Sequence, residues 1–518
     1  MNFFVYLLTA ASCAAATKIY PENSSQPKST HSSPNILLII TDQFRFDAWS
    51  EETTPNLSRL SKQAGATTFT SAYSSTPTCT PSRAGLLTGR SPWNHGMLGY
   101  DKDVDCANYP TTLPRVLNEN GYTTFVSGKD HFGTNPDGTF ISQGYENLQL
   151  YDGLTEENDH YDQWFHSIVG DDVDPLATGN LTWNAWQSSP YVFEEYLHPT
   201  AWTSSRAVSY LDTFDFTGSS KMFLKASFHR PHSPYDPPKR LYDKYTSMDP
   251  SLPIFQRNIN PGTYDDAYLN TTTMGSEAWN GDPGPSASFL SRAAYLASVE
   301  FVDEGIGDIL SKVEETDEEF MIIWVADHGD MNGDHNLWRK GYPFEESSHV
   351  PMIMKHPTST SPPKSSSAIV EIRDVAVTIW DVIGKLEEVK ENDELINGLS
   401  LLPILEGEKE KVRDYVDLEH NQVYSDNVHW NAIRGEGGIK YIFNSFDGRE
   451  QLFNVTSDRY EKRDLALESE YQEELGVWRQ RMVEQFEEEG RGEEWVKDGE
   501  LVMRKDNSLT HSPNFPCL

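Results

Sequence analysis

The chain alternates between short apolar runs and longer amphipathic segments, and this alternation predicts its fold. Continuous apolar runs such as NILLIIT at 35–41 and EFMIIWVA at 319–326 are typical of strands buried on both faces of a sheet. Between them lie segments with apolar residues at helical spacing, the longest at 288–315. Strands that alternate with helices indicate an α/β fold with a large, mostly parallel sheet flanked by helices.

Polar clusters follow three of the predicted strands. TDQ, SFHRPH and ADHGD occupy 41–43, 227–232 and 326–330. Ligands of open α/β sheets bind beyond the carboxyl ends of the strands, so we expect the chemistry to gather at one edge. The same pattern predicts a helix at 54–65, a helix–turn–strand unit at 113–131, a strand at 350–357 and a helix at 374–386, with long irregular insertions at 145–202 and 235–286.

The pattern of apolar and polar residues changes after about residue 405. Short strand-like runs at 414–420, 429–435, 440–445 and 450–455 predict an antiparallel meander. A helix follows with one apolar face, formed by Leu475, Trp478, Met482 and Phe486. The predicted organisation is a signal peptide at 1–16, a polar lead-in at 17–33, a catalytic domain at 34–405 and a C-terminal α+β subdomain with an acidic tail at 406–518.

Charge excludes one class of partner. Of the 518 residues, 79 are acidic and 42 are Lys or Arg, which gives a formal net charge of -37. Nucleic-acid binding requires a basic face, so we expect no nucleic-acid partner. An anionic substrate would be repelled at long range, and an anion site must therefore be a locally cationic pocket.

The N-terminus has the pattern of an export signal. Its apolar run is too short to span a bilayer, and cleavage is expected between Ala16 and Thr17, although a bacterial lipoprotein acylated at Cys13 is an alternative. No later segment predicts a transmembrane helix. The expected location is extracellular, or the lumen of the secretory or lysosomal pathway. Glycosylation sequons, which fit this location, occur at Asn23, Asn56, Asn180, Asn270 and Asn454.

Removal of the leader leaves an odd number of cysteines. These are Cys79, Cys106 and Cys517. A disulfide between Cys106 and Cys517 would leave Cys79 over, or one of the others is free. Cys79 stands directly before Thr-Pro-Ser-Arg, which indicates a role other than a disulfide.

Five motifs carry a family resemblance. They are TDQ at 41–43, CTPSRAGLLTGR at 79–90, GKDH at 128–131, RPHSP at 230–234 and ADHGDMNGDHNLWRK at 326–340. In this order and spacing they resemble the type I, formylglycine-dependent sulfatases of the alkaline-phosphatase superfamily, over roughly residues 34–470. The resemblance implies an arylsulfatase-like sulfuric ester hydrolase, a hydrolase that releases an alcohol and inorganic sulfate through a covalent sulfate intermediate.

The resemblance also implies a modified residue and a metal site. Cys79 would be oxidised to formylglycine by a formylglycine-generating enzyme, and the aldehyde would hydrate to a geminal diol. One divalent cation would be held by Asp42, Gln43, the oxygen derived from Cys79, Asp327 and His328. Hard oxygen ligands favour Ca²⁺. Many relatives carry a second Asp in place of Gln43, and the lower charge of this site leaves Mg²⁺ open.

Further roles follow from the same resemblance. Lys129 and Lys340 would bind the sulfate and Arg83 would hold the formylglycine hydroxyl, although each could be an ordinary cation. His131 would take a proton during sulfate release, and His232 would protonate the leaving alcohol. Both roles suit histidine because its side chain titrates near neutral pH. Two further histidines near the motifs, His229 and His335, either face the pocket or only form structural hydrogen bonds.

The substrate is less well defined. The two insertions are rich in aromatic residues, which either stack on sugar rings or only pack the insertions: Trp164, Trp183, Trp186, Tyr191, Trp202 and Trp279. We expect a sulfated carbohydrate or aryl sulfate, a small molecule or glycan, ahead of choline sulfate. The alternatives are a phosphonate or phosphodiester hydrolase of the same superfamily and a non-catalytic binder of sulfated glycans. Nothing in the sequence defines the oligomeric state.

Overall fold

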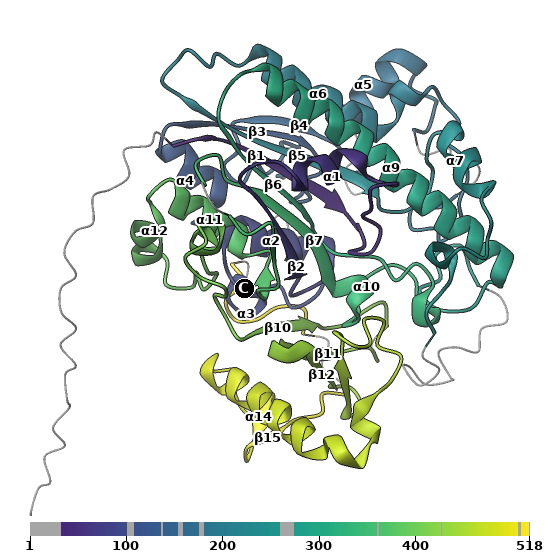
Figure 1. Cartoon of the computed structure of the whole chain (residues 1–518), viewed down its shortest axis with the longest axis vertical. Coiled ribbons are helices and arrows are strands. Elements are labelled where there is room, and N and C mark those ends of the chain that lie inside the picture. The colour runs from purple at the N-terminus through teal and green to yellow at the C-terminus, as the bar shows by residue number, and fades with distance from the viewer. Residues whose placement is uncertain are drawn as a thin grey trace, which may run out of the picture. The chain divides into compact units, whose positions relative to one another are not determined.

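A mixed sheet of nine strands forms the centre of the structure (Figure 1). The strand order is β4-β3-β5-β1-β6-β7-β2-β8, and β9 also pairs with β2. The pairs among β4, β3, β5, β1 and β6 are parallel, whereas β7 is antiparallel to both β6 and β2. The strands are β1 (Asn35–Asp42), β2 (Ala66–Tyr73), β3 (Tyr122–Gly128), β4 (Asn147–Leu150), β5 (Lys221–Pro231), β6 (Phe320–Ala326), β7 (His349–Lys355), β8 (Ser365–Ser366) and β9 (Val370–Glu371).

The computed structural model describes residues 33–100, 108–135, 138–153, 159–175, 181–259, 274–359, 362–425, 427–505 and 509–516. Pro34–Leu518 forms one unit, and the other unit, Met1–Ser33, lies outside the described residues except for Ser33. The predicted signal peptide and Cys106 and Cys517 also lie outside them. None of the helices in the described part of the chain has the length and apolar character needed to cross a membrane.

Helices cover both faces of the sheet. On one face α6 packs against β3 and β5, and α9 joins α6 to α1 and α7. On the other face α2, α4 and α11 contact one another (Figure 1). The helices are α1 (Pro55–Ser61), α2 (Cys79–Thr88), α3 (Pro92–His95), α4 (Leu113–Glu119), α5 (His160–Val169), α6 (Pro199–Thr213), α7 (Lys239–Thr246), α9 (Pro285–Glu315), α10 (Glu345–Ser348), α11 (Asp374–Val382), α12 (Leu386–Asn392) and α13 (Leu402–Leu405).

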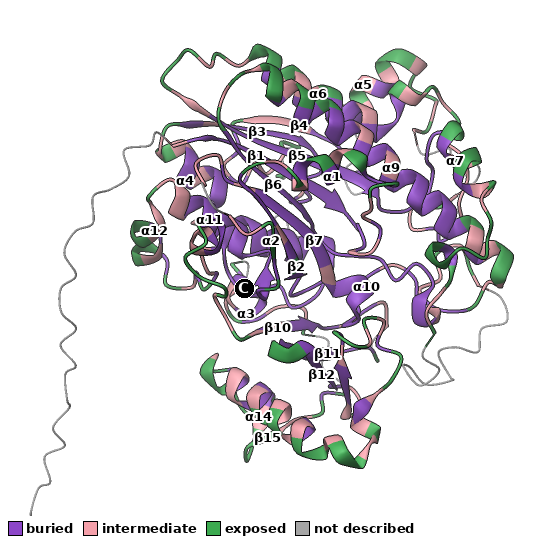
Figure 2. Cartoon of the chain, in the orientation of Figure 1, coloured by how far each residue is buried: buried purple, intermediate pink, exposed green. Residues whose placement is uncertain are grey.

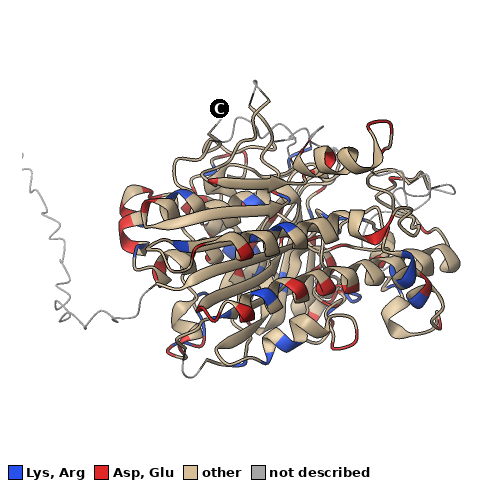
Figure 3. Ribbon diagram, turned by 90° about the horizontal axis from the view of Figure 1, so that it is seen from above, with Lys and Arg blue, Asp and Glu red and all other residues tan. Residues whose placement is uncertain are grey.

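The predicted hydrophobic runs are the buried strands. Every residue of β1 and β6 is buried, as Figure 2 shows for the centre of the sheet. Burial on both faces explains why these strands are continuously apolar. Acidic residues are spread over the helices and loops around the sheet (Figure 3).

A second, antiparallel sheet follows the main one. Its four strands have the order β10-β11-β12-β13, and α14 packs against it. The elements of this part are β10 (Tyr415–His420), β11 (Trp430–Gly435), β12 (Ile439–Asn444), β13 (Arg449–Asn454), α14 (Gln472–Glu488), β14 (Val496–Lys497) and β15 (Glu500–Leu501). One apolar cluster combines Tyr73 and Phe344 with Val416 and Trp430, so the two sheets share a core. The domain boundary at residue 405 remains a prediction.

Two expectations need refinement. The insertion at 145–202 is not irregular throughout, because it contains β4, α5 and the start of α6, and α7 lies within 235–286. The sequence also gave no sign of β2, whose residues ATTFTSAY include few large apolar side chains. It is nevertheless held in the sheet between β7 and the short strands β8 and β9.

Candidate active site

Cys79 is the first residue of α2. The preceding residue, Thr78, has extended backbone angles, and all ten residues of the helix are buried. The first N–H groups of a helix have no partner within it, and the helix dipole makes this end positive. The sequence therefore places residue 79 where an anion is stabilised.

Three neighbouring strands bring the predicted polar clusters to Cys79. Asp42 ends β1, Asp327 and His328 follow β6, and His232 follows β5. Because β5, β1 and β6 are adjacent and parallel, their carboxyl ends meet at one edge of the sheet. The three polar clusters therefore lie at the same edge of the sheet, as expected.

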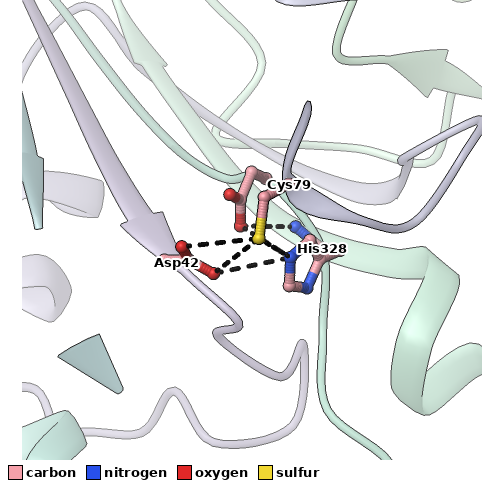
Figure 4. Close-up of side chains that lie close together, drawn as sticks. Asp42, Cys79 and His328 are labelled. Atoms are coloured by element: carbon pink, nitrogen blue, oxygen red, sulfur yellow. Dashed lines mark hydrogen bonds and ion pairs between the residues drawn. The ribbon is translucent and has the colours of Figure 1, made fainter. Parts of the chain in front are cut away.

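A group of potential metal ligands surrounds the sulfur. Asp42, Cys79, Asp327 and His328 each offer an atom, and these atoms all lie within 4.8 Å of one another. The Cys79 Sγ is 3.8 Å from both carboxylate oxygens of Asp42 and 3.3 Å from His328 Nε2. Figure 4 shows these three side chains pointing toward one another.

The chemistry of these residues fits a divalent cation. His328 Nδ1 lies 2.9 Å from the Gly329 carbonyl oxygen, to which it can only donate, so the Nε2 lone pair faces the group. The Gln43 amide nitrogen donates to Asp330 at 2.6 Å, while its buried amide oxygen has no hydrogen-bond partner among the described residues. An unsatisfied buried oxygen is costly unless something else binds it.

The two acidic ligands also repel each other. Burial and the nearby Cys79 oppose ionisation of Asp42, but Lys129, His232 and Lys340 hold its pKa below the usual value. Burial and the neighbouring Asp42 raise the pKa of Asp327. A bound cation would relieve this repulsion, so the donor set suits a metal site.

The three predicted cationic side chains, Lys129, Lys340 and Arg83, lie around the same group of potential metal ligands. Lys129 forms a buried ion pair with Asp42 and lies 3.5 Å from the sulfur, and Lys340 Nζ lies 3.1 Å from it. Arg83 binds one Asp327 oxygen through Nε at 3.0 Å and Nη2 at 2.8 Å. Its Nη1 donates to the Lys129 carbonyl at 3.0 Å, which ties the two segments together.

Gly128 allows Lys129 to take its position. Gly128 has a φ of 90°, and a Cβ there would lie 2.1 Å from the Ser227 carbonyl oxygen. The Lys129 amide donates to the same oxygen at 2.8 Å. Position 128, at the end of β3, therefore requires glycine for Lys129 to take its place in the site.

His131 and His232 line the same cavity as Cys79. Burial and Lys129 lower the pKa of His131 to about 4, and burial and Lys340 lower the pKa of His232 to about 3. His229 packs 4.8 Å from the His232 ring, and His335 packs against Phe344. Neither of these two is among the described residues that line the cavity.

The cavity has a volume of about 420 Å³ and opens above the sulfur. Of the aromatic residues in the insertions, Trp183 lines it. Trp186, Tyr191 and Trp202 are buried packing residues, Trp164 packs against Tyr161 and Trp202, and Trp279 stacks on Tyr424.

Comparison with known proteins agrees with this geometry. The model of the Sulfatase family matches residues 34–385. An arylsulfatase of Clostridium perfringens (strain 13 / Type A) is 32% identical over 495 residues, which cover 91% of this chain and 97% of that protein. The chain belongs to the sulfatase family. This sulfatase is accordingly a sulfuric ester hydrolase.

Other similarities extend along the whole sulfatase chain. The family model N-sulphoglucosamine sulphohydrolase, C-terminal, matches residues 333–488. A choline-sulfatase of Rhizobium meliloti (strain 1021) is 28% identical over 84% of this chain and 83% of that protein. Among solved structures, the phosphonate monoester hydrolase of Agrobacterium radiobacter has a TM-score of 0.68 and 21% identity, over 91% of this chain and 99% of that one.

A second solved structure contains a substrate. It is a complex with D-glucosamine-2-N,6-O-disulfate, with a TM-score of 0.67 and 21% identity over 89% of this chain and 99% of that one. These structural similarities show that the sulfatase shares their fold.

Sequence reasoning missed several residues of the cavity wall. Tyr100, Asp152, Arg339, Gln422 and Tyr424 all line the cavity of this sulfatase. Arg339 directly precedes Lys340 in the WRK segment, and this position is the sequence signal that could have identified it. The others lie in loops that no motif marks, and only the packing of the second sheet against the first brings 422–424 to the site.

Proposed function

We propose that this protein is a secreted sulfatase that uses formylglycine at position 79 to hydrolyse an aryl or carbohydrate sulfate ester. The observation that carries the proposal is the position of Cys79 at the start of α2, among two lysines and a group of metal-ligand side chains. After conversion, the diol oxygens would stand where the sulfur now lies. The arylsulfatase and the disulfated glucosamine complex support these two substrate classes.

The first half of the reaction transfers the sulfuryl group. One diol hydroxyl of residue 79 attacks the sulfur of the ester, and the bond from sulfur to the alcohol oxygen breaks. His232, protonated once the anionic ester lies beside it, donates a proton to the departing alcohol, the attacking hydroxyl loses its proton to solvent, and a sulfate ester remains on residue 79. Lys129 and Lys340 stabilise the sulfuryl oxygens as their charge grows.

The second half releases sulfate. His131 accepts the proton of the second hydroxyl, the bond from carbon to the sulfate oxygen breaks, and the carbonyl forms again. Water then adds to the carbonyl and restores the diol. The reaction is nucleophilic catalysis in two steps.

Asp42, Gln43, Asp327 and His328, with the oxygen of residue 79, would hold one divalent cation. The bound ion supplies positive charge that favours the deprotonated hydroxyl. The oxygen-rich ligand set favours Ca²⁺, and Mg²⁺ is the alternative. Arg83 keeps Asp327 oriented through a hydrogen bond from Nε and an ion-pair contact from Nη2 to the same carboxylate oxygen.

Conversion of Cys79 constrains the order of events. Cys79 is 2% exposed and the whole of α2 is buried. A formylglycine-generating enzyme would therefore have to read 79–83 before the chain folds. This order fits export through the secretory pathway, which the N-terminal leader predicts.

Two measurements test the proposal. Mass spectrometry of a peptide that contains 79–83, with aldehyde-specific labelling, should detect formylglycine, and Cys79→Ala should abolish both the label and hydrolysis of 4-nitrophenyl sulfate. The kcat/KM for this sulfate should exceed that for a phosphonate monoester and a phosphodiester with the same leaving group. A strong preference for phosphorus would replace the assignment with a phosphonate or phosphodiester hydrolase. Binding of sulfated glycans without turnover would replace it with a binding protein.

A further inference from the structure

The wall of the cavity beyond the sulfate position carries a cation that the proposed reaction does not use. This cation is Arg339, and it lines the same cavity as Cys79, Tyr100, Trp183 and Tyr424. We propose that Arg339 is a specificity residue that binds a second anionic group on the alcohol part of the substrate. The preferred substrate is then a ring-containing sulfate ester that also carries a carboxylate or a second sulfate. This inference rests on the proposed sulfatase function.

The backbone holds Arg339 in a defined place. Its φ is 70°, which is uncommon for a residue with a side chain, and its carbonyl accepts a hydrogen bond from the Met331 amide at 2.7 Å. It follows Trp338, which is fully buried, and precedes Lys340, whose Nζ lies 3.1 Å from the Cys79 sulfur. A strained backbone between two fixed neighbours is typical of functional sites.

The Arg339 side chain is positioned but has hydrogen-bonding capacity to spare. Its guanidinium lies 4.3 Å from the centre of the Tyr424 ring, a cation–π contact. The buried Nε has no hydrogen-bond partner in the part of the chain that the structure describes. Tyr424 in turn lies close to the chemical site, because its hydroxyl accepts a hydrogen bond from the Lys340 amide at 3.4 Å. A guanidinium that lies over a ring keeps N–H donors available for a carboxylate or sulfate.

The two lysines of the cavity lie at the position of the reacting group. Lys129 is paired with Asp42, and Lys340 lies against the reactive sulfur. Asp152 is the carboxylate among the described lining residues, and it accepts hydrogen bonds from the backbone amides of 130 and 131. Arg339 is thus the cation that remains for the substrate beyond the sulfate.

Two aromatic side chains provide faces for a ring. Tyr100 is 41% exposed, and its ring centre lies 6.3 Å from that of His131. Trp183 packs over Gly153 and lies 5.8 Å from His232 with an interplanar angle of 34°. These aromatics alone would also suit a quaternary ammonium alcohol, but Arg339 would repel a cation there. The charge of the wall therefore favours an anionic alcohol over choline.

A binding experiment separates this inference from the catalytic proposal. The Cys79→Ala protein, loaded with Ca²⁺, is titrated with 4-nitrophenyl sulfate, with the same ester bearing a ring carboxylate, and with choline sulfate. We expect the carboxylated ester to bind at least about tenfold more tightly than 4-nitrophenyl sulfate, which lacks the carboxylate, as a charge-assisted contact provides. Choline sulfate should bind more weakly than both.

The Arg339→Gln substitution in the Cys79→Ala background should remove the preference. It should weaken binding of the carboxylated ester by about tenfold or more and of 4-nitrophenyl sulfate by less than about threefold. Arg339→Lys should retain part of the preference. Arg459→Gln is the matched control, because Arg459 also lies over an aromatic ring, at 4.5 Å from the centre of Phe46, but is not among the described residues that line the cavity.

Equal affinity of the Cys79→Ala protein, with Arg339 intact, for the two aryl esters would overturn the inference. Equal loss of both affinities in Arg339→Gln, or a preference that survives this substitution, would also overturn it. Failure of the proposed function would give a different result. Protein with formylglycine at position 79 would hydrolyse neither aryl ester, while the Cys79→Ala protein would still bind the carboxylated ester more tightly. The two proposals can therefore fail separately.

Discussion

Lys129 and Lys340 flank Cys79 at similar burial but differ in their ion pairing. Lys129 is 2% exposed and paired with the buried Asp42, whereas Lys340 is 6% exposed and forms no ion pair with a carboxylate among the described residues. Its described contact at the site is the Cys79 sulfur. In the converted protein this thiol is replaced by an uncharged diol, and Lys340 is left as an unpaired buried cation.

This difference predicts unequal effects on stability from the same substitution at the two lysines. Removal of one partner of a buried ion pair costs about 3–5 kcal/mol, because the other charge remains buried, so Lys129→Gln should lower the free energy of unfolding by about that amount. Lys340→Gln removes a buried charge without a charged partner and should change it by less than about 1 kcal/mol, or increase it. Both substitutions remove a contact to the sulfuryl oxygens, worth about 1.5–3 kcal/mol, so kcat/KM should fall about tenfold to a hundredfold in each.

Urea denaturation of the converted, metal-free protein measures the stability difference, and initial rates with 4-nitrophenyl sulfate and restored metal measure the activity. Lys239→Gln serves as the control, because Lys239 is exposed and its ion pair with Asp243 lies on the surface. The control should change the unfolding free energy by less than about 0.5 kcal/mol. If Lys340→Gln destabilised the protein as much as Lys129→Gln, the reasoning from ion pairing would be refuted.

Three further predictions follow from the structure. Gln43→Leu removes an oxygen of the metal site and should raise the Ca²⁺ concentration for half-maximal thermal stabilisation by at least about tenfold; an unchanged value would exclude Gln43 as a ligand. Gly329→Ala should cost more than about 2 kcal/mol of unfolding free energy, because its Cβ would lie 2.0 Å from the Glu346 carbonyl oxygen, whereas Gly476→Ala, in open space on α14, should stabilise by about 0.5–1 kcal/mol. Burial and two nearby arginines lower the pKa of His95 from 6.5 to about 3, so between these values the unfolded chain binds an extra proton and stability falls as the pH decreases. His95→Gln should reduce this slope, by up to about 1.4 kcal/mol per pH unit, in urea denaturation from pH 7 to pH 4; an identical slope would contradict it.

The sequence predicted the central sheet well because its strands are buried on both faces. Such strands are continuously apolar, and β1 and β6 lie within one or two residues of the predicted runs. The polar clusters at their ends could be located for the same reason, since adjacent parallel strands end at one edge. Asp42, Cys79, Asp327 and His328 therefore meet as expected.

What the sequence could not predict depends on contacts between distant segments. β2 has few large apolar residues and is a strand because β7 and β8 pair with it. Arg339 and Tyr424 meet because the second sheet packs on the first, and local sequence carries no signal of such packing. The structure also separated Trp183, which reaches the cavity, from Trp186 and Trp202, which pack the core.

The loop between β10 and β11 is separate in sequence from the residues proposed to carry out the reaction. The groups proposed to break the sulfur–oxygen bond all precede residue 341, while residues 422–425 contribute to the wall of the cavity. Mutations in this short stretch can redirect which esters are accepted and leave the reacting groups intact.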